Sequence, residues 1–182
     1  MEIRIIVLLL ILTSGLAIAQ ASDTIIKPIK KEFFPLEVGN KYIYAIKTGF
    51  KRPKIIGHDT ILVYSKFSEE DYHVFSLNNG KVYYLKGDSV YVINITEYKK
   101  YDYNLLYFPT KKSTHYMKNG SCGFKIIETS YLPTYKIGNK IYTNCYKFIS
   151  GNNCVVVIAF GIGIIKTICN GESRELISIE LK

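Results

Sequence analysis

Residues 154–169 read CVVVIAFGIGIIKTIC, with two apolar runs around a glycine pair and a cysteine at each end. Glycines after an apolar run can open a phosphate-binding loop, but such a loop needs a helix directly behind it. Here the mostly β-branched residues 164–168 and then Asn170-Gly171 follow, which is typical of a strand running into a turn. Lys166 also occupies the place of the third glycine of G-x-G-x-x-G. The stretch therefore predicts a β-hairpin and excludes a nucleotide cradle.

A two-residue turn at Gly161-Ile162 would set the register of this hairpin. Phe160 then faces Gly163, and every facing pair of residue numbers has the same sum. Cys154 and Cys169 share that sum, so they lie opposite each other at the separation that a cross-strand disulfide needs. We therefore predict a Cys154–Cys169 disulfide. A one-residue bulge at the glycine pair would slide the two cysteines off opposition.

Short β-rich runs and tight turns continue from Phe33 to the C-terminus. Runs of five to ten residues rich in Tyr, Ile, Val, Phe and Thr alternate with turns containing Asn and Gly, which accept the positive φ of tight hairpins. No stretch shows apolar residues at helical spacing over three turns. The pattern predicts a single antiparallel all-β domain over residues 33–182, folded as a strongly curved sheet or β-barrel of roughly ten strands.

The N-terminus has the layout of a secretory signal peptide. Arg4 precedes an apolar run that ends in small residues spaced for cleavage near Ala19 or Ala21. The alternative is a transmembrane anchor, which needs about 20 apolar residues, and this run is shorter. We therefore predict a signal peptide over residues 1–19, a polar lead over residues 20–32, and a secreted or periplasmic protein that does not span the membrane.

Pairing Cys154 with Cys169 leaves Cys122 and Cys145, which we predict to form a second disulfide. Their midpoint falls at Pro133-Thr134, where the chain can reverse, but Gly138-Asn139 competes as the turn and would shift the pairing. The alternative is that all four cysteines are reduced and buried. Export favours the oxidised form.

The charge of the chain is positive and scattered. Lys and Arg number 24 against 15 Asp and Glu, which gives a net charge of +9 at pH 7. A basic exported protein can meet an envelope component such as an anionic glycan or a lipid surface, and these are the candidate partners. The lysines line no single predicted element, which is typical of solvated surface. Nucleic acid is excluded as a partner because we expect the protein outside the cell.

The sequence contains no familiar catalytic or metal-binding motif. Both G-x-S-x-G, which presents the nucleophile of many hydrolases, and C-x-x-C are absent. His58, His73 and His115 are far in sequence from one another and from the cysteines. His58 and Asp59 are neighbours, but adjacent strand residues point to opposite faces. We therefore predict no catalytic residue, no metal and no cofactor.

Two motifs near the ends of the domain carry a resemblance. They are FFPLEVGNKYIY (33–44) and FGIGIIK (160–166), with GNKIYTNCYKF (138–148) ahead of the second. Together they resemble a group of uncharacterised exported bacterial β-proteins, many from the Bacteroidota, that open with F-P-L-x-x-G-x-x-W-x-Y and close with G-V/I-G-x-V/I-K. Tyr42 stands where that group has Trp. The resemblance implies an antiparallel curved sheet or barrel over residues 33–182, and it implies no activity.

The opening motif also has a physical interpretation of its own. Pro35 holds the chain extended, Leu36 and Val38 begin the buried core, and Gly39-Asn40 turns the chain into the first strand. We interpret these as residues of the fold and not of a site.

Taken together, these features favour a non-enzymatic exported envelope protein. A Tyr-rich β-domain suits the binding of a ligand or partner on the concave face of a curved sheet, because each Tyr offers an apolar ring and a polar tip. The alternative is a hydrolase whose carboxylates or histidines come together from different strands, since such a site need not appear as a motif.

Export is directly measurable. Mass spectrometry of the secreted or periplasmic product should find an N-terminus at Gln20 or Ser22, because cleavage follows the small residues before these positions. An intact Met1 in a cytosolic fraction would contradict the prediction.

Overall fold

The computed structural model describes residues 22–49, 53–69, 71–95, 101–119, 123–150 and 154–182, and the predicted signal peptide lies outside these ranges. All the regular secondary structure within these ranges is β-strand, so the all-β prediction is confirmed. The strands are β1 (Thr24–Ile26), β2 (Lys41–Thr48), β3 (Lys54–Glu69), β4 (Tyr72–Leu77), β5 (Val82–Lys86), β6 (Ser89–Ile95), β7 (Tyr101–Tyr107), β8 (Lys112–Asn119), β9 (Gly123–Ile137), β10 (Lys140–Ser150), β11 (Val155–Ala159), β12 (Gly163–Cys169) and β13 (Glu172–Glu180).

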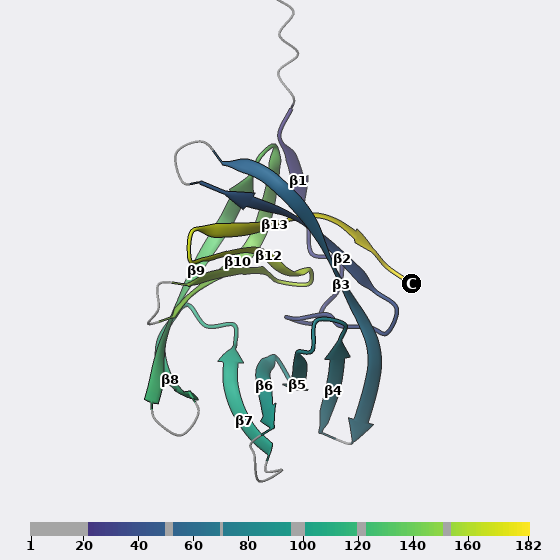
Figure 1. The fold of residues 1–182 in the computed structure, drawn as a ribbon, viewed down its shortest axis with the longest axis vertical. Coiled ribbons are helices and arrows are strands. Elements are labelled where there is room, and N and C mark those ends of the chain that lie inside the picture. Colours follow the sequence, from purple (N-terminus) through teal and green to yellow (C-terminus); the bar gives the residue numbers. More distant parts are fainter. Residues whose placement is uncertain (1–21, 50–52, 70, 96–100, 120–122, 151–153) are drawn as a thin grey trace, which may run out of the picture.

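The strands form one sheet built from two meanders. Strands β2 to β7 pair in chain order, and strands β8 to β13 do the same, so each meander is a series of antiparallel hairpins. A single ladder, β2 with β13, joins the two meanders, from Lys41↔Glu180 to Thr48↔Glu172. The ends of the order are β7 and β8, and no ladder joins them within the described residues, so the sheet is open (Figure 1). The described residues contain thirteen strands in this sheet, where roughly ten were predicted.

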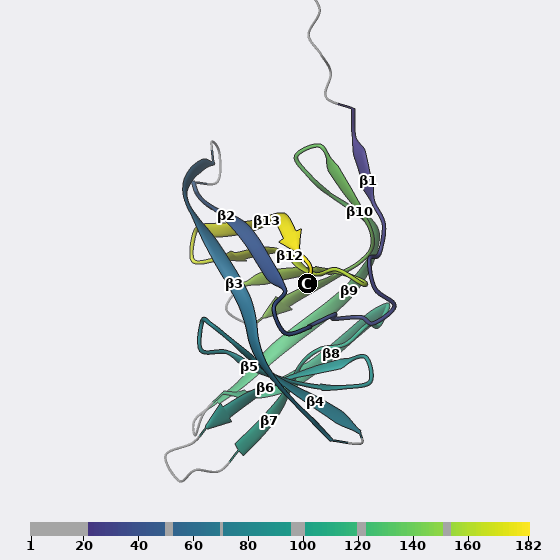
Figure 2. The ribbon, with the colours of Figure 1, turned by 90° about the vertical axis from the view of Figure 1, so that its right-hand side faces the viewer.

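Strands far apart in this order share one core. The ring of Tyr107 on β7 lies 4.8 Å from the ring of Phe148 on β10, although eight strands separate β7 from β10 in the order. Figures 1 and 2 both place β4 to β7 below β12 and β13. The two meanders therefore face each other across an interior.

Two consecutive phenylalanines fill this interior from the segment before β2. The ring of Phe33 packs edge-on against Tyr146 of β10 at 5.5 Å, while Phe34 packs against Tyr83 of β5 at 5.6 Å and Tyr107 of β7 at 6.3 Å. Both phenylalanines are buried. The FF pair of the opening motif thus contacts both meanders, one residue to each.

The hairpin of residues 154–169 is present, but its turn differs from the predicted one. Ala159 faces Gly163, so the turn spans the three residues 160–162 and not two. A bulge then leaves Ile165 without a partner, because Val157 faces Lys166 while Ile158 faces Ile164. The longer turn shifts the register by one residue, and the bulge shifts it back.

The predicted disulfide is confirmed because these two shifts cancel. Val155 faces Ile168, as the two-residue turn would also have required, so the cysteines flanking this pair lie opposite each other. Cys154 and Cys169 are joined, with their Cα atoms 4.4 Å apart. The bridge closes a loop of 15 residues, which the chain-entropy model values at about 3 kcal/mol.

The predicted Cys122–Cys145 pair relied on a reversal of the chain at Pro133-Thr134, and the structure has no reversal there. The chain reverses at the competing turn, Gly138-Asn139, and β9 runs straight through Pro133 and Thr134. Cys145 consequently faces Leu132, and its buried thiol is bonded to no cysteine within the described residues. Burial raises the pKa of that thiol to about 12. Cys122 lies outside the described residues, so the Cys122–Cys145 disulfide stays a prediction.

The polar lead predicted over residues 20–32 belongs in part to the domain. Thr24–Ile26 forms β1, which pairs in parallel with Lys140–Tyr142 at the beginning of β10. This part of β10 extends beyond its pairing with β11, which begins at Cys145, and its free edge can therefore accept a strand. Pro28 ends the strand but does not detach the segment.

The segment after β1 is held against the turn of the hairpin. The backbone N–H groups of Ile29 and Lys30 both donate to the carbonyl oxygen of Gly161, at 3.1 and 3.0 Å. This close approach leaves no space for a side chain at position 161, since a Cβ there would lie 2.2 Å from the Lys30 carbonyl oxygen.

A triad of charges spans the ladder between the meanders. Glu175 of β13 pairs with Lys47 of β2 and, at 2.8 Å, with Lys166 of β12. Burial alone would raise the pKa of Glu175, but hydrogen bonds from the two lysines outweigh it and hold that pKa below its usual value.

Replacing Gly161 should cost more stability than replacing Gly80. Both have positive φ, +71° and +79°, so Ala at either adds about 1 kcal/mol of backbone strain. A Cβ on Gly80 meets nothing within 4 Å, whereas one on Gly161 clashes with the Lys30 backbone. We expect Gly161→Ala to lower the free energy of unfolding by about 3 kcal/mol in urea titrations. Equal losses for the two variants would contradict the contact.

The triad predicts a pH dependence of stability. Because the folded-state pKa of Glu175 is lowered, its contribution is present above the unfolded pKa of about 4.3 and is lost as pH falls through the folded value. Glu175→Gln should therefore cost about 1–2 kcal/mol at pH 7 and less in acid. Urea midpoints at both pH values measure this.

The control for that experiment lies on the same strand. Glu180 pairs with Lys41 at 3.0 Å, but both side chains are about half exposed, so Glu180→Gln should change stability little at either pH. A loss for Glu175→Gln that persisted unchanged in acid would contradict the assignment.

Candidate functional site

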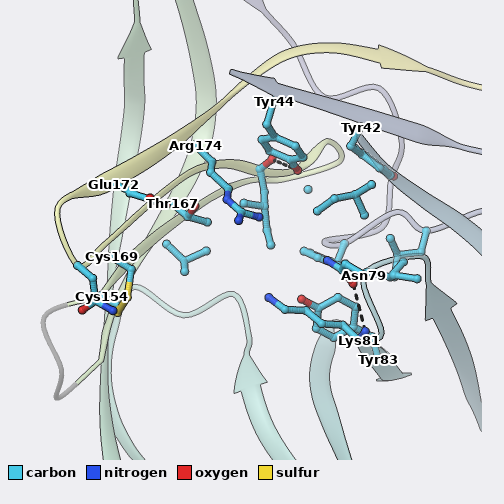
Figure 3. A pocket seen from close by; sticks show the side chains of 18 residues that line it. Tyr42, Tyr44, Asn79, Lys81, Tyr83, Cys154, Thr167, Cys169, Glu172 and Arg174 are labelled. Carbon is cyan, nitrogen blue, oxygen red and sulfur yellow. Dashed lines mark hydrogen bonds between the residues drawn. A yellow bond between two sulfur atoms is a disulfide. The ribbon is translucent and has the colours of Figure 1, made fainter. Parts of the chain in front are cut away.

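A cavity of about 740 Å³ lies between the two meanders. Its wall comes from β2, β3, β4, β5, β11, β12 and β13, from the segment before β2 and from three connecting segments (Figure 3). This volume is within the usual range for small-molecule sites. The lining residues are Phe34, Leu36, Tyr42, Tyr44, Ile61, Leu77, Asn79, Lys81, Tyr83, Cys154, Val156, Gly163, Ile164, Thr167, Cys169, Asn170, Glu172 and Arg174.

One part of the wall is apolar and closed. Phe34, Leu36, Leu77 and Tyr83 each line the cavity and are at most 9% exposed, so they belong both to the core and to the cavity surface. Ile61 of β3 continues this surface. An apolar ligand that displaces water from these side chains would bind with a favourable free energy.

Tyrosines on β2 and β5 extend this apolar wall. The hydroxyl of Tyr44 donates to the carbonyl oxygen of Ile164 at 2.9 Å, and the hydroxyl of Tyr42 donates to that of Pro35. Burial raises the pKa of Tyr42 and of Tyr83 to about 12, and it also raises the pKa of Tyr44 well above its ordinary value. These phenols therefore stay neutral, and hydrogen bonding leaves the rings of Tyr42 and Tyr44 as fixed apolar surface.

Exposed polar residues line the cavity at two places, one on each side of it. Asn79 and Lys81, in the segment between β4 and β5, and Asn170 and Glu172, at the start of β13, all line the cavity and are exposed. Thr167 of β12 lies beside Glu172 in Figure 3. The cavity is thus amphipathic, since buried apolar side chains and exposed polar side chains both line it.

Arg174 projects from β13 into the cavity. Its Nη1 donates to a carboxylate oxygen of Asp59 at 2.6 Å, across the intervening strand β2. The side chain of Arg174 is 43% exposed, so the guanidinium remains in contact with solvent. Figure 3 shows the side chains of Arg174 and Lys81 pointing into the same space from different walls.

The disulfide forms one edge of the cavity. Cys154 and Cys169 both line it, at the end of the β11–β12 hairpin farthest from the turn (Figure 3). Because the bridge joins the two strands there, it holds Val156 and Thr167 in position along the same wall.

Residues of both motifs behind the resemblance meet at the cavity. Phe34, Leu36 and Tyr42 of the opening motif and Gly163 and Ile164 of the closing motif all line it. In the sequence these residues have the pattern of ordinary core residues, and only the structure shows that they also border the cavity. Of the two residues of the opening motif that were expected to begin the buried core, Leu36 is buried, but Val38 is 44% exposed, so that expectation is wrong for Val38.

Other lining residues escaped the sequence analysis. Arg174 is a cation at a strand position that faces the interior, and Lys81 lies in a turn that is distant in sequence from the rest of the wall. The alternation of side chains along a strand could have identified Arg174, because it points to the same face as Leu176, two residues on, which is buried. No local signal indicated Lys81.

The histidines lie apart from the cavity wall. His58 is exposed on β3, and the Nδ1 atom of His73 on β4 lies 3.0 Å from the Ser68 hydroxyl. The side chain of His115 is outside the described part of the chain. Across the described ranges, no group of three His, Cys, Asp or Glu side chains is placed to hold a metal ion. The same ranges hold no helix long and apolar enough to cross a membrane.

The sequence matches no protein-family model and no curated protein. Among solved structures, the chain is similar to a protein from Parabacteroides distasonis ATCC 8503 that is described as a "putative lipoprotein". The two are 9% identical, the alignment covers 82% of this chain and 99% of that one, and the TM-score is 0.41. A likeness at this level adds nothing to the argument about the site.

Proposed function

We propose that this is an exported envelope protein that binds a ligand in the cavity on the concave face of its sheet, without catalysing a reaction. The observation that carries the proposal is the cavity itself, which combines buried apolar side chains with exposed polar side chains. Ligand sites typically pair a mostly apolar wall with a few polar groups that orient the ligand.

The placement outside the cytoplasm is supported by two features. The Cys154–Cys169 disulfide is stable in an oxidising compartment such as the periplasm or the exterior. The first residues of the sequence also have the layout of a signal peptide.

The hydrolase alternative receives less support. It needs acids or histidines from different strands within hydrogen-bond reach of one another. On the described wall of the cavity the acidic side chain is Glu172, which is exposed, and nearby Asp59 is bound to Arg174. These charges suit the orientation of a polar group better than general acid–base chemistry.

Filling the cavity should abolish binding. Ile61 lines the cavity and Thr60, its neighbour on β3, is exposed, so Ile61→Trp adds bulk inside and Thr60→Trp adds it outside. The neutral fluorescent dye N-phenyl-1-naphthylamine, which brightens in apolar sites, serves as the probe. We expect Ile61→Trp to weaken dye binding by at least about tenfold and Thr60→Trp to leave it unchanged.

Melting curves of both variants show whether the fold survives the new side chain. If Ile61→Trp melts like the parent protein and still binds the dye at full affinity, the cavity is not the binding site. Absence of saturable dye binding to the parent protein would also contradict the proposal.

A further inference from the structure

The polar part of the cavity carries a specific arrangement of charge. Arg174 and Lys81 enter it from different walls, one from a central strand and one from a turn of the other meander. Two cations that point into an apolar cavity suit a ligand with an apolar tail and an anionic head.

We propose, on the basis of the proposed function, that the ligand is an amphipathic anion. Its tail lies against the closed apolar wall, and its carboxylate or phosphate head lies between Arg174 and Lys81. The observations behind this are the buried apolar side chains that line the cavity and the two cations that point into it from different walls.

Arg174 is prepared for this role by Asp59. A guanidinium has five N–H donors in a rigid plane, and within the described residues the bond from Nη1 to Asp59 is the hydrogen bond that the side chain makes. The remaining donors are available to a second acceptor. Because Asp59 already orients the side chain, less conformational freedom is lost when an anion binds.

Acidic groups near the cations restrict where the head can lie. Asp59 compensates part of the charge of Arg174, and Glu172 adds a negative charge to the cavity wall. Figure 3 places Glu172 beside Thr167, across the cavity from Lys81. An anionic head is therefore favoured on the Lys81 side of Arg174 and disfavoured beside Glu172.

The tail has a continuous apolar surface to cover. Ile61 and Leu77 come from the meander of β2 to β7, and Phe34 and Leu36 come from the segment before β2. None of the four carries a polar side-chain group. A tail without hydrogen-bonding groups leaves no buried polar atom unpaired against this surface, whereas a sugar would. The wall thus selects against a free glycan in the closed part.

Displacement of N-phenyl-1-naphthylamine tests the ligand class on the full mature protein. The competitors share one tail and differ in the head: dodecanoate, dodecyl phosphate, dodecanol and dodecyltrimethylammonium, all below their micelle concentrations. Acetate and inorganic phosphate supply the heads alone. We expect the two anionic amphiphiles to displace the dye at about tenfold lower concentration than dodecanol or the cation, and the free anions to displace it least.

Charge variants then locate the head. Arg174→Gln and Lys81→Gln should each reduce the dodecanoate-to-dodecanol preference several-fold, whereas Lys54→Gln, an exposed lysine away from the cavity, should leave it intact. Arg174→Gln leaves the carboxylate of Asp59 without its cationic partner. The double variant Arg174→Gln with Asp59→Asn therefore repeats the measurement without an unpaired carboxylate.

The outcomes separate this inference from the proposed function. If all amphiphiles displace the dye equally, the cavity binds ligands without a preference for anions, and the inference fails alone. A cation preference, or an anion preference that survives all of the cavity charge variants, overturns it as well. Free phosphate competing as well as dodecyl phosphate would show that the tail is not bound in the cavity, and would overturn the inference. If no competitor displaces the dye and Ile61→Trp has no effect on it, the proposed function fails too.

Discussion

The pairing of β2 with β13 is the constraint on which the rest of the structure depends. Every other ladder on the path through the sheet joins strands that are neighbours in the chain, so the hairpins form from local sequence. Within the described residues, the β2–β13 ladder is the one ladder that joins the two meanders, and the buried side chain of Asn40 extends it by accepting the Lys182 backbone N–H at 3.1 Å. Without it, the interior that holds Phe33 and Phe34 would have one wall.

The same ladder explains why charge lies on both sides of the sheet at this place. Consecutive residues of β13 point to opposite faces, so Arg174 reaches the cavity and Glu175 reaches the lysine triad. Arg174 bonds Asp59 two strands away, and Glu175 bonds Lys47 on the intervening strand. The ion pairs therefore hold three adjacent strands in register, while one of the cations remains in contact with the cavity.

The local parts of this fold could be predicted from the sequence and the non-local parts could not. Alternating β-rich runs and Asn-Gly turns indicate hairpins, since turn chemistry and side-chain period act over a few residues. Nothing in residues 41–48 identifies residues 172–180 as their partner. The apolar wall of the cavity was visible only as core, and the convergence of Lys81 with Arg174 depends on the non-local ladder. For this reason the disulfide was predictable and the charged residues of the cavity wall were not.

The hairpin of residues 154–169 shows how a local argument can be right at the end of a hairpin and wrong within it. Its turn is set by a distant segment, because the N–H groups of Ile29 and Lys30 occupy the Gly161 carbonyl and leave space only for glycine. A three-residue turn alone would move Cys154 out of line with Cys169, and the bulge at Ile165 restores the alignment. The disulfide reports the sum of these two irregularities, so cysteine spacing fixes the register at the bridge and leaves the path between the bridge and the turn undetermined.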